Sequence, residues 1–419
     1  MADVRSEELY DRAREVLVGG VNSPVRAMRS IGRDPLFIDR AEGPYVWDAD
    51  GNRYVDYLST WGPAILGHAD PTVIAALRDA LPRGTSYGAP TEREVLMAEA
   101  VVAAFPSIEK LRMTSSGSEA VTGAIRLARA ATGRDAVVKT IGGYHGAIDA
   151  LLVEAGSGAT TLGHPNSAGV PEGAVAATRL VPYNDLEAAD AALAGAAAVI
   201  VEPVAGNMGT VLPGPGYLEG LREACDRHGA LLIFDEVITG FRLALGGAQE
   251  RFGIRADITC LGKIIGGGLP VGAFGARREI MAEIAPEGPC YQAGTLSGNP
   301  LATTAGLATL AALAEPGVYE RLEASGQALE EAIRESGAPV VVNRIGSLLT
   351  PFFTTGPVTD YASATASDTK AYGRFARALL DEGVSPPPSQ FECWFTGLTH
   401  GDDELRLTRE ALARAVERL

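Results

Sequence analysis

Cysteine and histidine are scarce in this sequence of 419 residues. The four cysteines, Cys225, Cys260, Cys290 and Cys393, are far apart and form no Cys-x-x-Cys pair. A disulfide framework and a zinc site are therefore not expected, and a reducing compartment fits this cysteine usage. The five histidines show no metal-ligand spacing, so we predict no metal site.

Long apolar runs and excess positive charge are also missing. The longest apolar runs, 191–201 and 264–275, are well below the ~20 residues that a membrane-spanning helix needs. The first residues lack the basic start and apolar core of a signal peptide, so we expect a soluble, cytoplasmic protein. The net charge of −16 argues against a broad surface for nucleic acid or anionic membranes.

The chain does contain regular alternation of apolar strand-like runs with helical patterns, from about residue 70 to about residue 300. The expected strands are 110–113, 136–139, 178–181, 198–202, 231–235 and 258–261. This alternation predicts an α/β fold with a mainly parallel sheet covered by helices. Since a chain of this length exceeds the usual size of a single core, we expect a large domain at 66–305 and a smaller α+β domain at 306–419. Residues 1–65 would form an N-terminal segment that packs against the small domain and the active site.

A lysine lies in an unusual position between an apolar run and three consecutive glycines, in Leu261-Gly-Lys263-Ile-Ile-Gly-Gly-Gly268. Upstream, the strand at 231–235 ends in Asp235, and ligands of α/β sheets bind at such strand ends. A lysine in a glycine-rich loop and an acid at a strand end suggest pyridoxal phosphate, with Lys263 forming the Schiff base and Asp235 pairing with the pyridine nitrogen. The alternative is a solvated surface lysine and an aspartate that caps a helix.

Three further strand ends carry polar or aromatic groups. Ser116, Gly117 and Ser118 open the helix expected at 120–132, where backbone amides would bind a phosphate. Ser116-x-x-Glu119 is equally a capping box that needs no ligand. Tyr144, on the glycine-flanked loop 142–146, suits stacking on a flat cofactor, and 202–207 is a polar strand end. The long stretch 155–171 has little periodicity, and we interpret it as a mobile lid.

Two residues near the N-terminus could contact a ligand. Arg26 follows an irregular Gly/Pro segment, and an arginine on a loop is well suited to bind a substrate carboxylate. Trp61 could line a pocket. The commoner explanations are a solvated arginine and a tryptophan in the core.

Together these residues resemble the class III, fold-type I pyridoxal phosphate enzymes, and more narrowly the glutamate-1-semialdehyde 2,1-aminomutase family. The resemblance covers nearly the whole chain. It is carried by the motifs Gly-Gly-Val-Asn-Ser-Pro-Val-Arg26, Trp61-Gly-Pro-Ala-Ile-Leu-Gly-His, Tyr183-Asn-Asp-Leu-Glu, Val201-Glu-Pro-Val-Ala-Gly-Asn-Met-Gly, Leu261-Gly-Lys-Ile-Ile-Gly-Gly-Gly, Gln292-Ala-Gly-Thr-Leu-Ser-Gly-Asn-Pro and Pro388-Ser-Gln-Phe-Glu392.

The resemblance implies roles for individual residues. Lys263 would be the Schiff-base lysine and proton shuttle, Asp235 the partner of the pyridine nitrogen, and Tyr144 a neighbour of the ring. The remaining cofactor residues would be Ser116, Gly117, Ser118, His145, Asn207, Val237 and Thr295, with Thr295 reaching the phosphate from the other subunit of a homodimer. The substrate site would comprise Ser23, Arg26, Trp61, Ser157 and Glu392.

The implied reaction is an internal amino exchange on pyridoxamine phosphate and pyridoxal phosphate. It would convert glutamate-1-semialdehyde to 5-aminolevulinate, the tetrapyrrole precursor, via 4,5-diaminovalerate. The lid would retain this diamine, and glutamyl-tRNA reductase would be the upstream partner enzyme.

Some positions depart from the motifs of that family. Ile141 and Ala147 stand where an acid and a histidine are frequent, Ser115 replaces a usual asparagine, and Asp70 a frequent histidine. Cys393 and Trp394 replace small residues beside Glu392. The alternative function is therefore an intermolecular class III aminotransferase for a β- or ω-amino or other unusual carboxylate. A catalytically silent relative with a binding or regulatory role is a further alternative, which the presence of both Lys263 and Asp235 disfavours.

Overall fold

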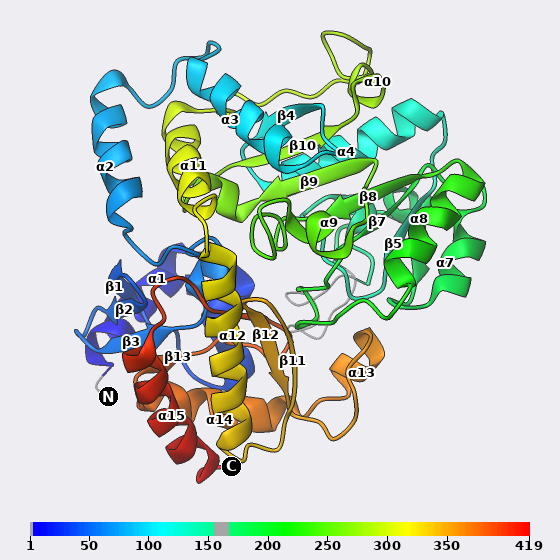
Figure 1. The fold of residues 1–419 in the computed structure, drawn as a ribbon. Coiled ribbons are helices and arrows are strands. Elements are labelled where there is room, and N and C mark those ends of the chain that lie inside the picture. The colour runs from blue at the N-terminus through cyan, green and yellow to red at the C-terminus, as the bar shows by residue number, and fades with distance from the viewer. Residues whose placement is uncertain (1–2, 155–166) are drawn as a thin grey trace.

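A computed structural model of the chain describes residues 3–154 and 167–419. Ser157 and most of the expected lid lie outside these residues. Figure 1 shows a large α/β part built on one long sheet, and below it a second part with smaller sheets and three long helices. The prediction of an α/β fold is confirmed.

The long sheet has seven strands, and the six strands predicted from the sequence are all present in it. In spatial order these are β4 (Lys110–Thr114), β10 (Gly272–Ala276), β9 (Ile258–Gly262), β8 (Leu231–Asp235), β7 (Ala198–Val201), β5 (Val137–Thr140) and β6 (Thr178–Val181). Five of them are parallel, whereas β10 runs antiparallel to both of its neighbours. β10 was not predicted because Gly-Ala-Phe-Gly-Ala lacks the β-branched residues typical of strands.

Both faces of the sheet are buried, which explains the continuous apolar runs. Val199 and Leu232 face helices α7 (Leu186–Leu193) and α8 (Tyr217–His228). Their neighbours Ala198 and Ile233 face α4 (Gly117–Thr132) on the other side. The other helices of this part are α2 (Pro71–Ala80), α3 (Glu92–Ala104), α6 (Glu172–Val175), α9 (Gly247–Phe252), α10 (Arg278–Met281) and α11 (Pro300–Leu313).

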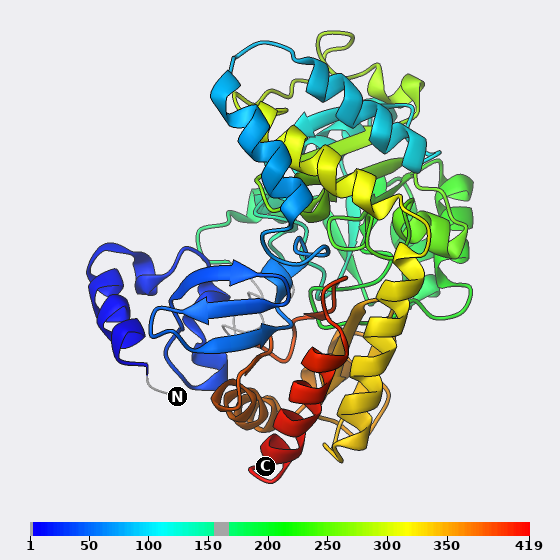
Figure 2. The ribbon, with the colours of Figure 1, turned by 60° about the vertical axis from the view of Figure 1, so that its left-hand side comes forward.

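The second part combines the two ends of the chain. A four-stranded sheet has the order β1 (Ile38–Glu42), β2 (Tyr45–Asp48), β3 (Arg53–Asp56) and β13 (Val384–Ser385), and a three-stranded sheet has the order β11 (Val341–Ile345), β12 (Leu348–Phe352) and β14 (Trp394–Phe395). The helices are α1 (Val4–Val16), α12 (Val318–Glu335), α13 (Tyr361–Thr365), α14 (Thr369–Asp381) and α15 (Asp402–Val416). Figures 1 and 2 place the N-terminal strands, in blue, beside the C-terminal helices, in orange and red.

Strand β13 pairs in parallel with β3, so the N-terminal hairpin and the C-terminal region share one sheet. We propose the division into 1–65, 66–305 and 306–419 that the sequence suggests, and this shared sheet supports grouping the first and third segments. Within the described residues, no single helix is long and apolar enough to cross a membrane. Only α11 and α12, bent by 84° at their junction, could do so as a pair, by length and composition alone.

Candidate active site

The candidate catalytic groups lie where neighbouring strands of the long sheet end. β8 ends at Asp235, and β9 leads directly into Lys263, the first residue of the short helix η7 (Lys263–Gly266). Because β8 and β9 are parallel and paired, their carboxyl ends meet at one edge of the sheet. Lys263 has a φ of +49°, which a non-glycine residue rarely adopts. Such strain is typical of functional positions, where the surrounding structure holds it.

Asp235 is held in a fixed orientation by two donors. Its Oδ2 lies 2.8 Å from Nδ1 of His145, and its Oδ1 accepts a hydrogen bond from the Val237 backbone N–H at 3.1 Å. His145 is fully buried, and its Nε2 has no partner among the described residues. Burial lowers the pKa of His145, and the Asp235 carboxylate partly offsets this effect.

Lys263 is the cation among these acids. Burial lowers the pKa of its amine, and Asp235, Glu202 and Glu392 oppose this shift by their charge. A buried lysine of reduced basicity is a better nucleophile and a better proton carrier at neutral pH than an exposed one.

The amino end of α4 points its backbone amides toward the same region. Ser116 is the N-cap residue, and its Oγ accepts a hydrogen bond from the Glu119 N–H at 3.2 Å. The Glu119 carboxylate reaches back to the Ser115 N–H at 2.6 Å. Capping therefore uses the Ser116 hydroxyl and the Ser115 and Glu119 amides, which leaves the Gly117 and Ser118 amides for an anion.

The loop after β5 packs against this helix end. Gly146 has a φ of +82°, and a methyl group at this position would lie 2.6 Å from Ser118 Cα. The Ala147 N–H donates to Ser118 Oγ at 3.3 Å. Only glycine permits this approach, which places Tyr144 beside the helix end; burial raises the pKa of the Tyr144 phenol.

These groups surround one cavity of about 200 Å³. Nine of the residues expected from the sequence line it, namely Ser116, Gly117, Ser118, Tyr144, His145, Asn207, Asp235, Val237 and Lys263. The other lining residues are Val121, Gly146, Glu202 and Ile238. The structure thus brings together residues from five separate segments of the sequence.

The residues expected to bind substrate do not line this cavity. Arg26 is exposed in the short helix η2 (Pro24–Ala27), and Ser23 is its N-cap residue. Trp61 precedes Gly62, where a methyl group would lie 3.5 Å from Lys263 Cδ, so this loop packs against the lysine. Glu392 acts on Lys263 by its charge. Thr295 is exposed on the loop before α11 and lines a different surface pocket.

The unusual side chains beside Glu392 do not enter the cavity. Trp394 is fully buried in the core of the second part and stacks on Tyr57, with ring centroids 5.8 Å apart. Cys393 is buried, and its Sγ donates to the Gly206 carbonyl at 3.2 Å. Asp70 is the N-cap residue of α2, and its carboxylate accepts hydrogen bonds from the Thr72 and Val73 amides.

Glu202 is a member of the site whose side chain was not singled out from the sequence. Its Oε2 accepts hydrogen bonds from the Gly206 N–H at 2.8 Å and from Asn207 Nδ2 at 2.9 Å, whereas its Oε1 is buried without a partner in the described part of the chain. Burial, reinforced by the charge of Asp235, raises the pKa of Glu202 to about 8. The polar strand end 202–207 was the available signal.

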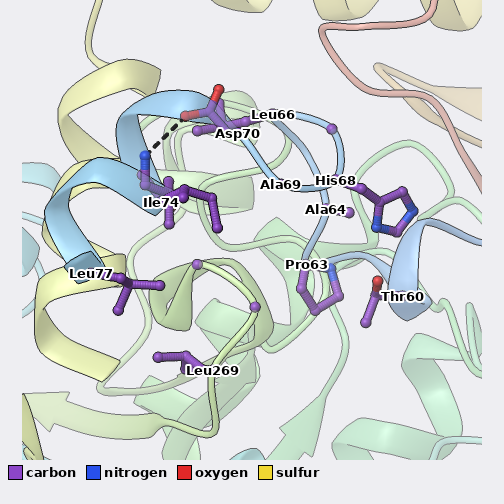
Figure 3. Close-up of a pocket in the computed structure, with 15 residues that line it drawn as sticks. Thr60, Pro63, Ala64, Leu66, His68, Ala69, Asp70, Ile74, Leu77 and Leu269 are labelled. Atoms are coloured by element: carbon purple, nitrogen blue, oxygen red, sulfur yellow. Dashed lines mark hydrogen bonds between the residues drawn. The ribbon is translucent and has the colours of Figure 1, made fainter. Parts of the chain in front are cut away.

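A larger cavity of about 280 Å³ lies between Thr60, the start of α2 and Leu269 (Figure 3). Figure 3 shows the Asp70 carboxylate turned toward the first turn of α2, where it accepts a hydrogen bond from Val73. The only other titratable lining residue is His68, whose Nε2 lies 2.8 Å from Asp56. Because both groups already have partners, we assign the chemistry to the smaller cavity around Lys263.

Comparison with known proteins agrees with this geometry. Residues 28–384 match the family model described as aminotransferase class-III. The chain belongs to the class-III aminotransferase family. It is 56% identical to a glutamate-1-semialdehyde 2,1-aminomutase from Pelotomaculum thermopropionicum, over 98% of this chain and 97% of that protein.

Solved structures of the family superpose on this class-III aminotransferase over nearly their full length. An omega-transaminase from Sphaerobacter thermophilus has a TM-score of 0.90 and 33% identity, over 98% of this chain and 97% of the other. A glutamate-1-semialdehyde-aminomutase from Pseudomonas aeruginosa PAO1 in complex with PMP has a TM-score of 0.87 and 30% identity, over 99% and 95%. The fold is therefore fold-type I, as the sequence suggested.

The described residues of this class-III aminotransferase fit a phosphorylated pyridine cofactor. The cavity has an amine at one wall, an oriented carboxylate at another, and a helix N-terminus with two amides not used in capping. These three features match the aldehyde carbon, the ring nitrogen and the phosphate of such a group.

Proposed function

We propose that this enzyme is a glutamate-1-semialdehyde 2,1-aminomutase that uses pyridoxal 5′-phosphate and pyridoxamine 5′-phosphate. Its relatives at 53–56% identity carry this name over nearly their full length. The observation that carries the proposal is the cavity in which Lys263 and the His145-oriented Asp235 lie together. When bound, the cofactor supplies a protonated pyridine ring that withdraws electrons from a neighbouring carbon.

The chain's own residues hold that ring and move protons beside it. Asp235, fixed by His145 and the Val237 amide, keeps the ring nitrogen protonated. The Gly117 and Ser118 amides at the start of α4 bind the phosphate. Lys263, whose pKa is lowered by burial, accepts and returns a proton at Nζ.

Further residues complete the proposed cofactor and substrate sites. Ser116, Tyr144, His145, Asn207 and Val237 contact the cofactor, and Arg26 binds the substrate carboxylate. Ser23, Trp61, Ser157 and Glu392 complete the substrate site. The packing of the Trp61–Gly62 loop against Lys263 and the charge of Glu392 near it support this arrangement.

A homodimer is part of the proposal, with Thr295 reaching the phosphate of the partner subunit. Thr295 is exposed and lies between the exposed apolar side chains of Tyr291 and Leu296. This agrees with a loop that contacts a second copy of the chain. We also propose a cytoplasmic enzyme of tetrapyrrole biosynthesis, supplied by glutamyl-tRNA reductase; the four buried free cysteines fit a reducing compartment.

The substrate and product of the proposed reaction are isomers, so the reaction needs no external amino donor. The test is 5-aminolevulinate formation from glutamate-1-semialdehyde by protein loaded with pyridoxamine phosphate, without donor or keto acid. Many turnovers per subunit are expected. A signal that stops at one turnover and resumes only with an added amino donor would show an intermolecular aminotransferase and overturn the proposal.

A further inference from the structure

Lys139 is a buried lysine that the proposed reaction does not use. The sequence contains four lysines, Lys110, Lys139, Lys263 and Lys370, so a buried position for one outside the cavity is conspicuous. Lys139 lies on β5, and its side chain is fully buried. A buried ammonium is costly, and a methionine of similar volume would fill the same space without that cost. The charge therefore needs an explanation.

The three N–H groups of the Lys139 ammonium have three backbone acceptors. Nζ donates to the carbonyls of Gly143 at 2.9 Å, Leu151 at 3.1 Å and Val153 at 2.8 Å. No ion pair of the described residues includes Lys139, although Glu202 and Glu154 act on it by charge from farther away. An ammonium is the side-chain group that can donate to three converging acceptors from one atom.

All three acceptors belong to one loop, residues 142–154. Its ends are joined by the Gly142 N–H, which donates to the Glu154 carbonyl at 2.9 Å. Lys139 therefore connects the start of this closed loop, at Gly143, with its end, at Leu151 and Val153. Tyr144, His145 and Gly146, which line the cavity, lie between these points.

The loop transmits this order to the cavity through two contacts. His145 meets Asp235 at 2.8 Å, and Gly146 packs on Ser118 at the start of α4. Without the ammonium, three carbonyls would lose their donor inside the protein, and the loop would rearrange to reach water. Both contacts depend on that loop remaining in place.

We propose that Lys139 is a positioning residue, which fixes the 142–154 loop so that His145 orients Asp235 and Tyr144 faces the cofactor ring. The proposal rests on the proposed use of pyridoxal phosphate. It assigns Lys139 no contact with cofactor or substrate.

The test compares Lys139→Met with Lys110→Met in the holoenzyme. Lys110 is the matched control because it is an exposed lysine that pairs with Glu287. We expect Lys139→Met to raise the hydrogen-exchange rates of the amides in residues 142–151 and to weaken pyridoxal phosphate binding by about tenfold or more. Lys110→Met should leave both unchanged. Wild-type exchange and affinity in Lys139→Met would overturn the proposal.

A double-mutant cycle with His145→Gln tests whether Lys139 acts through the loop. We expect the double variant to bind the cofactor about as weakly as Lys139→Met alone, and His145→Gln alone to retain wild-type exchange in the loop. Fully additive losses of affinity would contradict the proposal. If Lys139→Met does not fold, Lys139→Gln, which keeps two donors, takes its place in the cycle with the same expected order. None of these readouts needs a substrate, so they remain decisive whichever amino-transfer reaction the enzyme performs.

Discussion

Lys263 combines strain, burial and nearby acids in one residue. Its left-handed backbone conformation follows from the sharp exit of β9, and its side chain lies within the field of Asp235, Glu202 and Glu392. Burial and these acids act on its pKa in opposite directions. A proton carrier needs this balance, because it must both accept and release a proton near neutral pH.

We predict that Lys263→Ala lowers kcat by about 10³-fold or more, since proton transfer by a placed side chain is worth up to about 10⁴-fold. The variant should still bind the cofactor, because the α4 amides and Asp235 remain. Stopped-flow assay of 5-aminolevulinate formation, with cofactor content measured after gel filtration, checks both parts. Turnover near the wild-type rate would remove Lys263 from the reaction.

Glu202 gives a pH-dependent prediction. Its pKa is raised from an ordinary carboxylic value to about 8, so between pH ~4.5 and ~8 the folded protein binds a proton that the unfolded chain has lost. Folding stability from this group is therefore highest at low pH and falls as pH rises through that window, by up to ~1.4 kcal/mol per pH unit.

Glu202→Gln should remove this loss, so its thermal unfolding midpoint relative to wild type should be higher at pH 8 than at pH 6. Differential scanning calorimetry of the cofactor-free protein at both pH values measures it. Glu287→Gln, at an exposed glutamate, serves as the control. An equal difference at the two pH values would contradict the assignment of a buried, protonated Glu202.

At the level of elements, the cavity depends on how closely a loop approaches a helix end. Gly146 and Gly133 both have positive φ and lie near opposite ends of α4 in the sequence and fold. A methyl group at Gly146 would meet Ser118 Cα at 2.6 Å, whereas a methyl group at Gly133 has nothing within 4 Å. The two glycines thus separate backbone strain from steric contact.

We predict that Gly146→Ala weakens cofactor affinity by about tenfold or more, because the loop must move away from the proposed phosphate site. Gly133→Ala carries a similar conformational cost of ~1 kcal/mol but should retain affinity. Titration of cofactor-free protein, followed by absorbance, compares the two. Equal affinities would show that the Gly146–Ser118 contact does not support the site.

At the scale of the whole molecule, Arg242 joins three segments of the chain. It is fully buried, and its guanidinium donates to Ser347 Oγ at 2.9 Å, the Thr396 carbonyl at 3.2 Å and the Gly62 carbonyl at 2.5 Å. It also lies over the Phe395 ring at 4.9 Å. Burial lowers its pKa to about 10. Gly62 precedes the strands' partner region and packs on Lys263, so this residue links the second part of the molecule to the active site.

Arg242→Met should lower the thermal unfolding midpoint by several degrees, since it leaves three buried acceptors without their donor at ~1–3 kcal/mol each. Arg334→Met, at an arginine that is 62% exposed and pairs only along its own helix, should change the midpoint little. Calorimetry of both variants decides this. An unchanged midpoint for Arg242→Met would mean that the three contacts contribute little.

The sequence by itself determined the strand order of events: apolar runs that end in Asp235, Ser116 and the Glu202–Asn207 segment, and a lysine before three glycines. Strand ends and helix starts are local features, so their periodicity and punctuation predict both the elements and nine of the residues around the cavity. The α/β fold followed from the same patterns. The strand β10 did not, because its glycines and alanines carry no β signal.

Only the tertiary structure decided which groups meet across the chain. The His145–Asp235 contact joins residues 90 positions apart, Arg242 reaches Gly62 and Thr396, and Lys139 closes its own loop. The same holds for Trp394, which the sequence placed beside a pocket glutamate and the structure buries in the core. Burial and long-range hydrogen bonding depend on how elements pack, and a side chain's neighbours in sequence do not record that packing.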